Sequence, residues 1–217
     1  MLECKSYSAA ELLAATHTRT NVSAERRLTT QNIRWEKNGN GKRAQYTISD
    51  IPDPLRTYIV FDLGFPPQTD VKKFRDFAFH FLGDDVFRAM PQEMMEEAMR
   101  EMGQGVSRQT MANYIERLQA LDYINRSTDC VFYRVYKEYG VQKHDVVTKE
   151  EYCAAWKIYW DKIGCGYSSQ AAYSTMYNAF GGVPRKQAKY DENAFYKKEI
   201  DFLYDLVVES KINEISG

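Results

Sequence analysis

The stretch GQGVSRQTMANYIERLQALDYINRSTDCVFYRVY, residues 103–136, joins a helix pattern to a strand pattern. Ser107 is a suitable N-cap, because its side-chain oxygen can accept a hydrogen bond from the first helical turn. One apolar face then follows at the spacing i, i+4, i+7 and i+10: Met111, Ile115, Leu118 and Leu121. A polar turn at residues 125–130 precedes an alternating run that predicts a strand: Val131, Tyr133 and Val135.

The other face of this helix is polar and is expected to point outward: Arg108, Gln109, Thr110, Asn113, Tyr114 and Arg117. Side chains of these types contact base edges and phosphates, and a recognition helix presents its N-terminal half to the major groove of DNA. A solvated helix face has the same composition. The pattern alone leaves both interpretations open.

Two further helices are expected upstream of this one. The first has phenylalanines at helical spacing within residues 70–83. The second covers residues 90–103, where Pro91 suits the first turn and Gly103 suits the end. Three helices followed by a strand resemble the winged helix of phage and plasmid replication or regulator proteins. The resemblance implies a winged-helix unit at residues 71–140, with these DNA contacts: Arg108, Gln109, Thr110, Asn113 and Arg117.

The N-terminal segment predicts two helices and a hairpin. Ser8 and Glu11 form a capping box, in which each side chain can accept the other residue's backbone N–H. A second helix starts near Asn21 or Ser23, which are both good N-caps, and ends before the hairpin. Residues 33–48 predict two strands around an Asn-Gly-Asn-Gly centre, because these residues tolerate the positive φ of a hairpin turn.

This order of helix, turn, helix and hairpin resembles the winged helix-turn-helix of the MerR and excisionase-like families over about 45 residues. In those families a hairpin wing with an Arg and a Tyr follows the recognition helix, as Arg43 and Tyr46 do here. The turn differs, because Thr-Arg-Thr-Asn-Val-Ser at residues 18–23 replaces the usual Gly-Val-Ser. The resemblance implies a DNA-binding unit with these contacts: Arg26, Arg27, Thr30, Arg34, Lys42 and Arg43.

Residues 141–217 are expected to form a C-terminal helical domain. Helices start near Thr148 and Ser168, which are suitable N-caps, and a third helix with a Leu- and Val-rich face ends the chain. A basic loop between the last two helices contains Arg185 and Lys186. These two side chains either contact DNA phosphates or are simply solvated.

The chain therefore divides into four expected segments. They are a winged helix-turn-helix at 1–50, a linker at 51–70, a second winged helix at 71–140 and the helical domain at 141–217. Prolines bracket the linker, and its apolar run at 58–63 predicts one strand. The expected fold class is mostly α with small β wings, that is α+β, with two winged-helix units followed by a helical bundle.

Charge is distributed unevenly along the chain. The net charge of the 217 residues is −1, which gives no direct argument for nucleic acid. Residues 1–47 contain eight Lys and Arg and four Asp and Glu side chains, a net charge of +4. Residues 84–102 contain two and six, a net charge of −4. A near-neutral total can therefore include a basic face.

The sequence contains no motif that predicts an enzyme or a cofactor. It has no P-loop, no dinucleotide-binding glycine motif and no nucleophile elbow. Its four cysteines and three histidines are scattered, so we expect no metal site. It has no run of about 18 apolar residues and no recognisable signal peptide, so we expect no membrane partner and a cytoplasmic location.

We expect a non-enzymatic protein that binds double-stranded DNA. Its compact units are typical of a phage, plasmid or other mobile element, acting in replication, excision or transcription control. The alternative is a protein-interaction module that binds and inhibits a host nucleic-acid-processing enzyme, with such a host protein as its partner. A homodimer through the C-terminal helices would place two recognition helices on half-sites about one helical turn apart.

Overall fold

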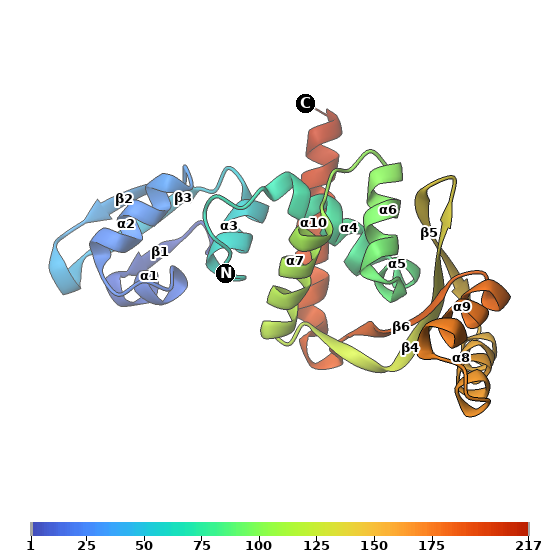
Figure 1. Cartoon of the computed structure of the whole chain (residues 1–217). Coiled ribbons are helices and arrows are strands. Elements are labelled where there is room, and N and C mark those ends of the chain that lie inside the picture. The colour runs from blue at the N-terminus through green and yellow to red at the C-terminus, as the bar shows by residue number, and fades with distance from the viewer. Residues whose placement is uncertain (1, 217) are drawn as a thin grey trace. The chain divides into compact units, whose positions relative to one another are not determined.

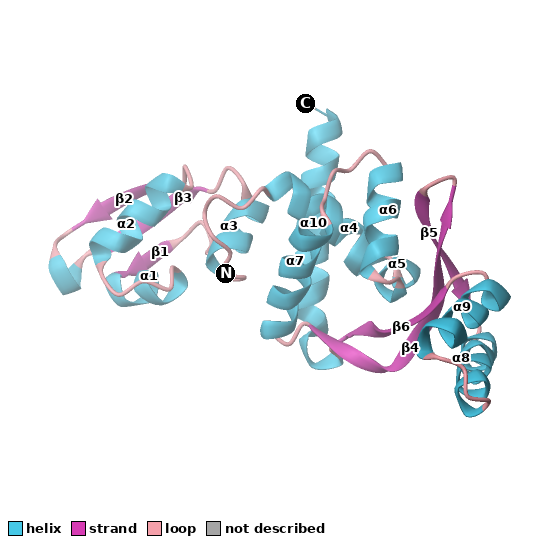
Figure 2. Cartoon of the chain, viewed as in Figure 1, coloured by secondary structure: helices cyan, strands magenta, loops and turns pink. Residues whose placement is uncertain are grey.

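The computed structural model describes residues 2–216, which fold into an α+β protein with two three-stranded antiparallel sheets (Figures 1 and 2). The α+β class expected from the sequence is confirmed. The chain divides into two compact units. Unit 1 contains the residues up to Gly83, residues 114–123 and the residues from Ala194 onward, and unit 2 contains residues 84–113 and 124–193.

The sheet of unit 1 lies near the N-terminus and has the strand order β1–β3–β2 (Figure 1). Its strands are β1 (Ser6–Ser8), β2 (Arg34–Asn38) and β3 (Gln45–Asp50). The helices α1 (Ala9–Ala15) and α2 (Asn21–Thr30) share an apolar core with this sheet. In β3, Tyr46 and Ile48 are buried, whereas Gln45, Thr47 and Ser49 are exposed, so the alternation expected from the sequence is confirmed.

Side-chain caps fix where the two helices begin. The capping box of Ser8 and Glu11 is confirmed: the Ser8 Oγ accepts the Glu11 N–H, and the Glu11 carboxylate accepts the Ser8 N–H. The cap of α2 is Thr20, and neither Asn21 nor Ser23, because the Thr20 Oγ1 accepts the Ser23 N–H at 3.2 Å. The expected hairpin between β2 and β3 is confirmed, and its loop contains the 3-10 turn Gly41–Arg43 (η1).

The rest of unit 1 is helical. It consists of α3 (Pro54–Phe61), α4 (Val71–Gly83), the second half of α7 (Arg108–Ala120), the 3-10 turn η2 (Ala194–Tyr196) and α10 (Lys197–Ser216). Its core contains one tight aromatic cluster, in which the Tyr114 ring lies 5.2–5.8 Å from the rings of Phe65, Phe74 and Phe77. The apolar face of the last helix is buried as expected: Ile200, Leu203, Leu206 and Val207.

The strand expected at residues 58–63 is wrong, because this segment belongs largely to helix α3. The Asp53 Oδ1 accepts the Arg56 N–H at 2.8 Å, and Pro54 occupies the first turn, where its missing N–H costs nothing. A short apolar run that is buried on most sides has the same composition in a helix and in a strand. The helix-start signals before the run therefore decided the structure.

Unit 2 contains helices and the second sheet, which has the strand order β5–β4–β6. Its helices are α5 (Asp85–Ala89), α6 (Gln92–Glu101), the first half of α7, α8 (Lys149–Gly164) and α9 (Ser169–Phe180). Its strands are β4 (Ile124–Glu138), β5 (Val141–Val147) and β6 (Val183–Glu192). The helix starts expected at Thr148 and Ser168 are confirmed by side-chain caps.

Two expectations for this part of the chain are wrong. The polar turn at residues 125–130 lies inside β4, where the pairing with β6 shifts register between Arg126 and Cys130. Polar residues fit there because a bulge leaves backbone groups unpaired. Residues 141–217 are also not purely helical, because they contribute β5 and β6. No helix within residues 2–216 is both long and apolar enough to cross a membrane.

Candidate nucleic-acid interface

Helix α2 presents one face to the core and another to solvent. Ala24 and Leu28 are fully buried, which fixes the rotation of the helix about its axis. The opposite face is exposed and includes Ser23, Arg26 and Thr30. Together with neighbouring side chains of unit 1, these residues line a hollow of about 430 Å³. This face has a size and composition that suit contacts with base edges or phosphates.

The loop of the β2–β3 hairpin lies beside the start of α2. The Asn21 Nδ2 donates a hydrogen bond to the Gly41 carbonyl at 3.3 Å, which ties the first turn of α2 to this loop. The next two residues, Lys42 and Arg43, are exposed. Within residues 2–216, neither of them forms an ion pair, and the same is true of Arg26. Residues 2–50 therefore include three exposed cations that form no ion pair, Arg26 on α2 and the other two in the hairpin loop.

Two of the expected contact residues are already engaged in contacts within unit 1. Arg27 is half-buried, donates a hydrogen bond to the Thr16 carbonyl at 2.5 Å and lies 5.4 Å from the centre of the Phe61 ring. Arg34 is exposed, and its Nε lies 3.5 Å from the Asp50 carboxylate. Sequence reasoning did not single out Arg19, which is exposed directly before the Thr20 cap. Its position before a helix N-terminus was the signal that could have identified it.

A polar cluster anchors α2 to the sheet. The Glu25 Oε1 accepts hydrogen bonds from the Lys37 Nζ at 2.9 Å and from the Tyr46 hydroxyl at 2.8 Å. The Lys37 hydrogen bond is the main cause that lowers the pKa of the Glu25 carboxyl. Burial, followed by the Glu25 contact, raises the pKa of Tyr46. The cluster therefore holds Glu25 ionised and orients α2 across β2 and β3.

The first half of α7 is exposed but electrostatically compensated. Arg108, Gln109 and Asn113 are exposed, and Thr110 is half-exposed. The Arg108 Nη1 lies 2.8 Å from a carboxylate oxygen of Glu93, and its backbone N–H donates to Glu96 at 3.1 Å. The Gln109 Nε2 donates a hydrogen bond to the Asn113 Oδ1 at 3.0 Å. The only cation among these four side chains is thus already paired with an acid of α6.

The second half of α7 differs from the sequence expectation. Tyr114 is buried in the aromatic cluster of unit 1, where burial raises its pKa to about 12. Arg117 is half-buried and donates a hydrogen bond from its Nε to the Leu63 carbonyl. Leu121 is half-exposed, whereas Met111, Ile115 and Leu118 are buried as expected. The expected contact residues that are exposed on α7 therefore lie within residues 108–113, and in the second half of the helix Glu116 and Ala120 are exposed.

Arg185 and Lys186 lie on strand β6, so the expected basic loop is wrong. Both side chains are exposed, and in the sheet they are opposite Tyr133 and Phe132 of β4. Successive residues of a strand point to opposite faces, so these two cations cannot act on one surface. The segment forms an edge strand because it pairs with the central strand β4. No local sequence pattern specifies this pairing.

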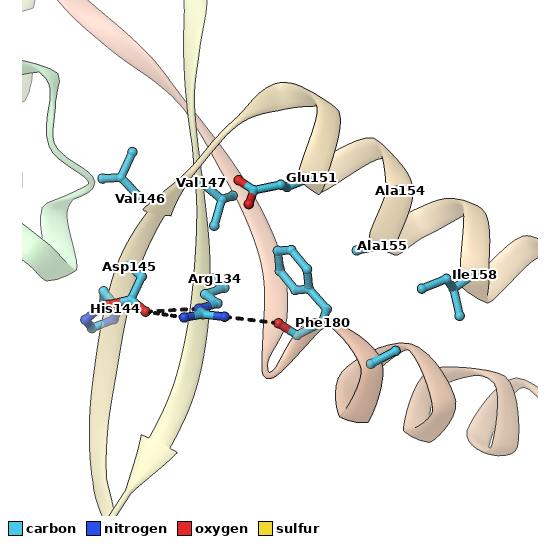
Figure 3. A pocket seen from close by; sticks show the side chains of 11 residues that line it. Arg134, His144, Asp145, Val146, Val147, Glu151, Ala154, Ala155, Ile158 and Phe180 are labelled. Atoms are coloured by element: carbon cyan, nitrogen blue, oxygen red, sulfur yellow. Dashed lines mark hydrogen bonds and ion pairs between the residues drawn. The ribbon is translucent and has the colours of Figure 1, made fainter.

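Unit 2 also contains an open groove between its ribbon β4–β5 and the helices α8 and α9 (Figure 3). Its volume is about 740 Å³. The Arg134 guanidinium binds the Asp145 carboxylate at 2.7 and 3.0 Å and the Phe180 carbonyl at 3.3 Å. Glu151 points to the same groove, and it accepts the Thr148 N–H of the α8 capping box. The charged groups of this groove are engaged with each other or with the backbone.

Metal-ligating residues do not gather anywhere in the described chain, residues 2–216. The cysteines Cys4, Cys130, Cys153 and Cys165 are free. No protein-family model, no curated protein and no solved structure matches the chain.

Proposed function

We propose that this protein binds double-stranded DNA through a winged helix-turn-helix formed by residues 1–50. The observation that carries the proposal is a set of exposed cations that form no ion pair within residues 2–216: Arg26 in the middle of α2, and Lys42 and Arg43 in the loop that is tied to the first turn of α2. Helix α2 would enter the major groove, and the hairpin loop would bind phosphates of the adjacent backbone.

The order of elements supports this assignment. Along the chain, a strand is followed by two helices joined by a short turn and then by a hairpin. The first strand and the two hairpin strands form a sheet in the order β1–β3–β2. The hairpin loop touches the helix that would read DNA, through Asn21 and Gly41. Such an arrangement lets one duplex contact a helix and a wing at the same time.

A cellular role is part of the same proposal. A cytoplasmic, non-enzymatic DNA-binding protein of a phage, plasmid or other mobile element would act in replication, excision or transcription control. Such a protein needs side chains that contact DNA and a fold that holds these side chains at fixed positions.

The alternative is a protein-interaction module that uses the acidic helix α6 to bind a host nucleic-acid-processing enzyme. The net charge of −4 over residues 84–102 favours it. Glu93 is paired with Arg108, Glu96 caps α7, and Glu97 lies 3.4–3.5 Å from His144 and Lys143. Because these carboxylates are engaged within unit 2, they offer little free charge to a partner.

Fluorescence anisotropy with a labelled duplex pool tests the proposal. The slope of log K against log salt is expected to fall by about 0.9 for each phosphate contact that is lost. The double variant Lys42→Ala/Arg43→Ala should lower both affinity and slope, whereas Lys149→Ala/Lys157→Ala removes the same charge from exposed sites on α8 and should change neither. Absence of binding to any duplex at low salt would reject the proposal in favour of the interaction module.

A further inference from the structure

The turn of the β4–β5 hairpin holds an aromatic residue in a conformation that such residues rarely adopt. Strand β4 ends at Glu138 and β5 begins at Val141, so Tyr139 and Gly140 form a two-residue loop. Both have positive φ, +49° and +80°. Loops of this kind strongly prefer Asn or Asp followed by Gly, because a side chain with a bulky ring is strained at positive φ.

The other positive-φ residues show that Tyr139 is the exception. His17, Asn32 and Asp122 are the remaining non-glycine residues with positive φ within residues 2–216. Each follows the end of a helix and is of a type that tolerates this conformation. The Tyr139 side chain is also 100% exposed, next to the half-exposed Val141. A strained and fully solvated ring does not stabilise the free protein, so its use lies in a contact with something else.

The same unit carries an apolar groove that could accept this ring. The groove has a volume of about 390 Å³ and is lined by Val86, Ala89, Met90, Met94, Val131 and Val146. Val86 and Val146 are 67% and 62% exposed. Methionine side chains adapt to an inserted group and make favourable contacts with aromatic rings. A groove with this lining suits an aromatic anchor.

A hairpin turn cannot reach the groove of its own copy. Val146 lies five residues along β5 from Val141, and a paired strand rises about 3.4 Å per residue, so the turn is roughly 17 Å away from the groove. Charge also matches between two copies. Exposed Glu138 precedes the turn, and Lys189 lies at the groove, so Glu138 of one copy can pair with Lys189 of the other; Asp85, also at the groove, is already paired with Arg88.

We propose that the β4–β5 turn of one copy inserts Tyr139 into the apolar groove of a second copy, and that the exchange is reciprocal. The partner is a second copy of this chain. A reciprocal exchange buries two identical contacts and closes as a two-fold symmetric dimer, with no open-ended assembly. This inference is independent of the DNA-binding proposal, because it concerns surfaces of unit 2 alone.

The test is the mass of the full chain in solution, measured by light scattering and sedimentation over a dilution series. The wild type is expected to dimerise. Tyr139→Asn removes the ring from both reciprocal contacts and should raise the dimer Kd about a thousandfold, which corresponds to the loss of two aromatic hot spots worth about 2 kcal/mol each. Asn is favoured in this loop, so the variant should keep its fold, as circular dichroism can verify. Tyr167→Asn, a matched change of another exposed loop tyrosine, should leave the mass unchanged.

The groove and the charges are tested separately. Val86→Glu places a charge in the groove at an exposed position and should weaken the dimer as Tyr139→Asn does. Glu138→Lys should weaken it by facing Lys189, and adding Lys189→Glu should restore it. A wild type that stays monomeric at its highest soluble concentration, or a dimer that survives both Tyr139→Asn and Val86→Glu, would overturn the proposal.

Discussion

Helices α2 and α7 have similar patterns but different surroundings. Each buries an apolar face and exposes polar side chains at its N-terminal half. Around α2, the side chains of Arg26, Lys42 and Arg43 are exposed and form no ion pair within residues 2–216. On the exposed half of α7, Arg108 is paired with Glu93, and Glu96 accepts its backbone N–H.

This difference teaches that the outward residues of a helix do not by themselves define a nucleic-acid surface. The net electrostatic potential at the surface determines whether phosphates bind there, because phosphate binding requires cations whose charge is not already compensated. Helix α6 supplies the compensation in unit 2, whereas Lys42 and Arg43 form no ion pair in the part of the chain that the structure describes. The comparison therefore favours α2 over α7 as the helix of the proposed DNA interface, and it gives the second half of α7 mainly a packing role.

Removing one core side chain from each region should give the largest effects. Leu28 of α2 and Met111 of α7 are both fully buried, so Leu28→Ala and Met111→Ala should each cost about 2–5 kcal/mol of unfolding free energy. Denaturant titrations measure this cost. Leu28→Ala should also reduce DNA affinity, and Met111→Ala should not. Equal losses of DNA binding in the two variants would break the comparison.

Charge reversal at the two helices should give the next largest effect. Arg26→Glu should lower duplex affinity by about 1–3 kcal/mol, because it replaces a cation at the proposed major-groove face by an anion. Arg108→Glu should change affinity much less, since Arg108 is already compensated by Glu93. Anisotropy titrations at one salt concentration compare them. If Arg108→Glu were the more damaging, α7 would be the reading helix.

A pH experiment sharpens the comparison from the α2 side. The Lys37 hydrogen bond lowers the pKa of Glu25 below its usual 4.5 in the folded state. The ionised carboxylate therefore stabilises the fold above about pH 4.5, and this contribution is lost as pH falls through the lowered value. Glu25→Gln should remove about 1 kcal/mol at neutral pH and flatten the acid side of the stability profile. An unchanged profile would show that the cluster does not anchor α2.

Much of the fold follows from local signals in the sequence. The capping boxes at Ser8 and Thr148, the alternation around Tyr46 and the glycine-rich β2–β3 hairpin are each encoded within a few residues. Such signals act over one helical turn or one strand, so they can be read without knowing the rest of the chain. They correctly specify most helices and the β2–β3 hairpin of the first sheet, but not its third strand, β1.

The wrong predictions have a common physical cause, which is contact between residues far apart in the sequence. The β6 strand at residues 183–192 forms because β4 lies beside it, and the buried Tyr114 depends on rings from α4. Neither contact is encoded near the residue concerned. The same holds for the candidate interface: the exposure of Arg26 follows from its helix face, whereas the inward turn of Arg27 depends on the Thr16 carbonyl and the Phe61 ring. Long-range pairing decided which expected cations are free.

The smallest effect should come from truncating the exposed half of α7. Asn113 is exposed and bonds only Gln109 among the contacts found in residues 2–216, so Asn113→Ala should change the unfolding free energy by no more than about 0.5 kcal/mol. Duplex affinity and base preference should also stay unchanged, as selection from a random duplex pool would reveal. If Asn113 instead made a bidentate contact to an adenine edge, the variant would lose about 1–3 kcal/mol of discrimination at one base pair. That loss would show that α7 reads DNA despite the pairing of Arg108, and the contrast between the two helices would fail.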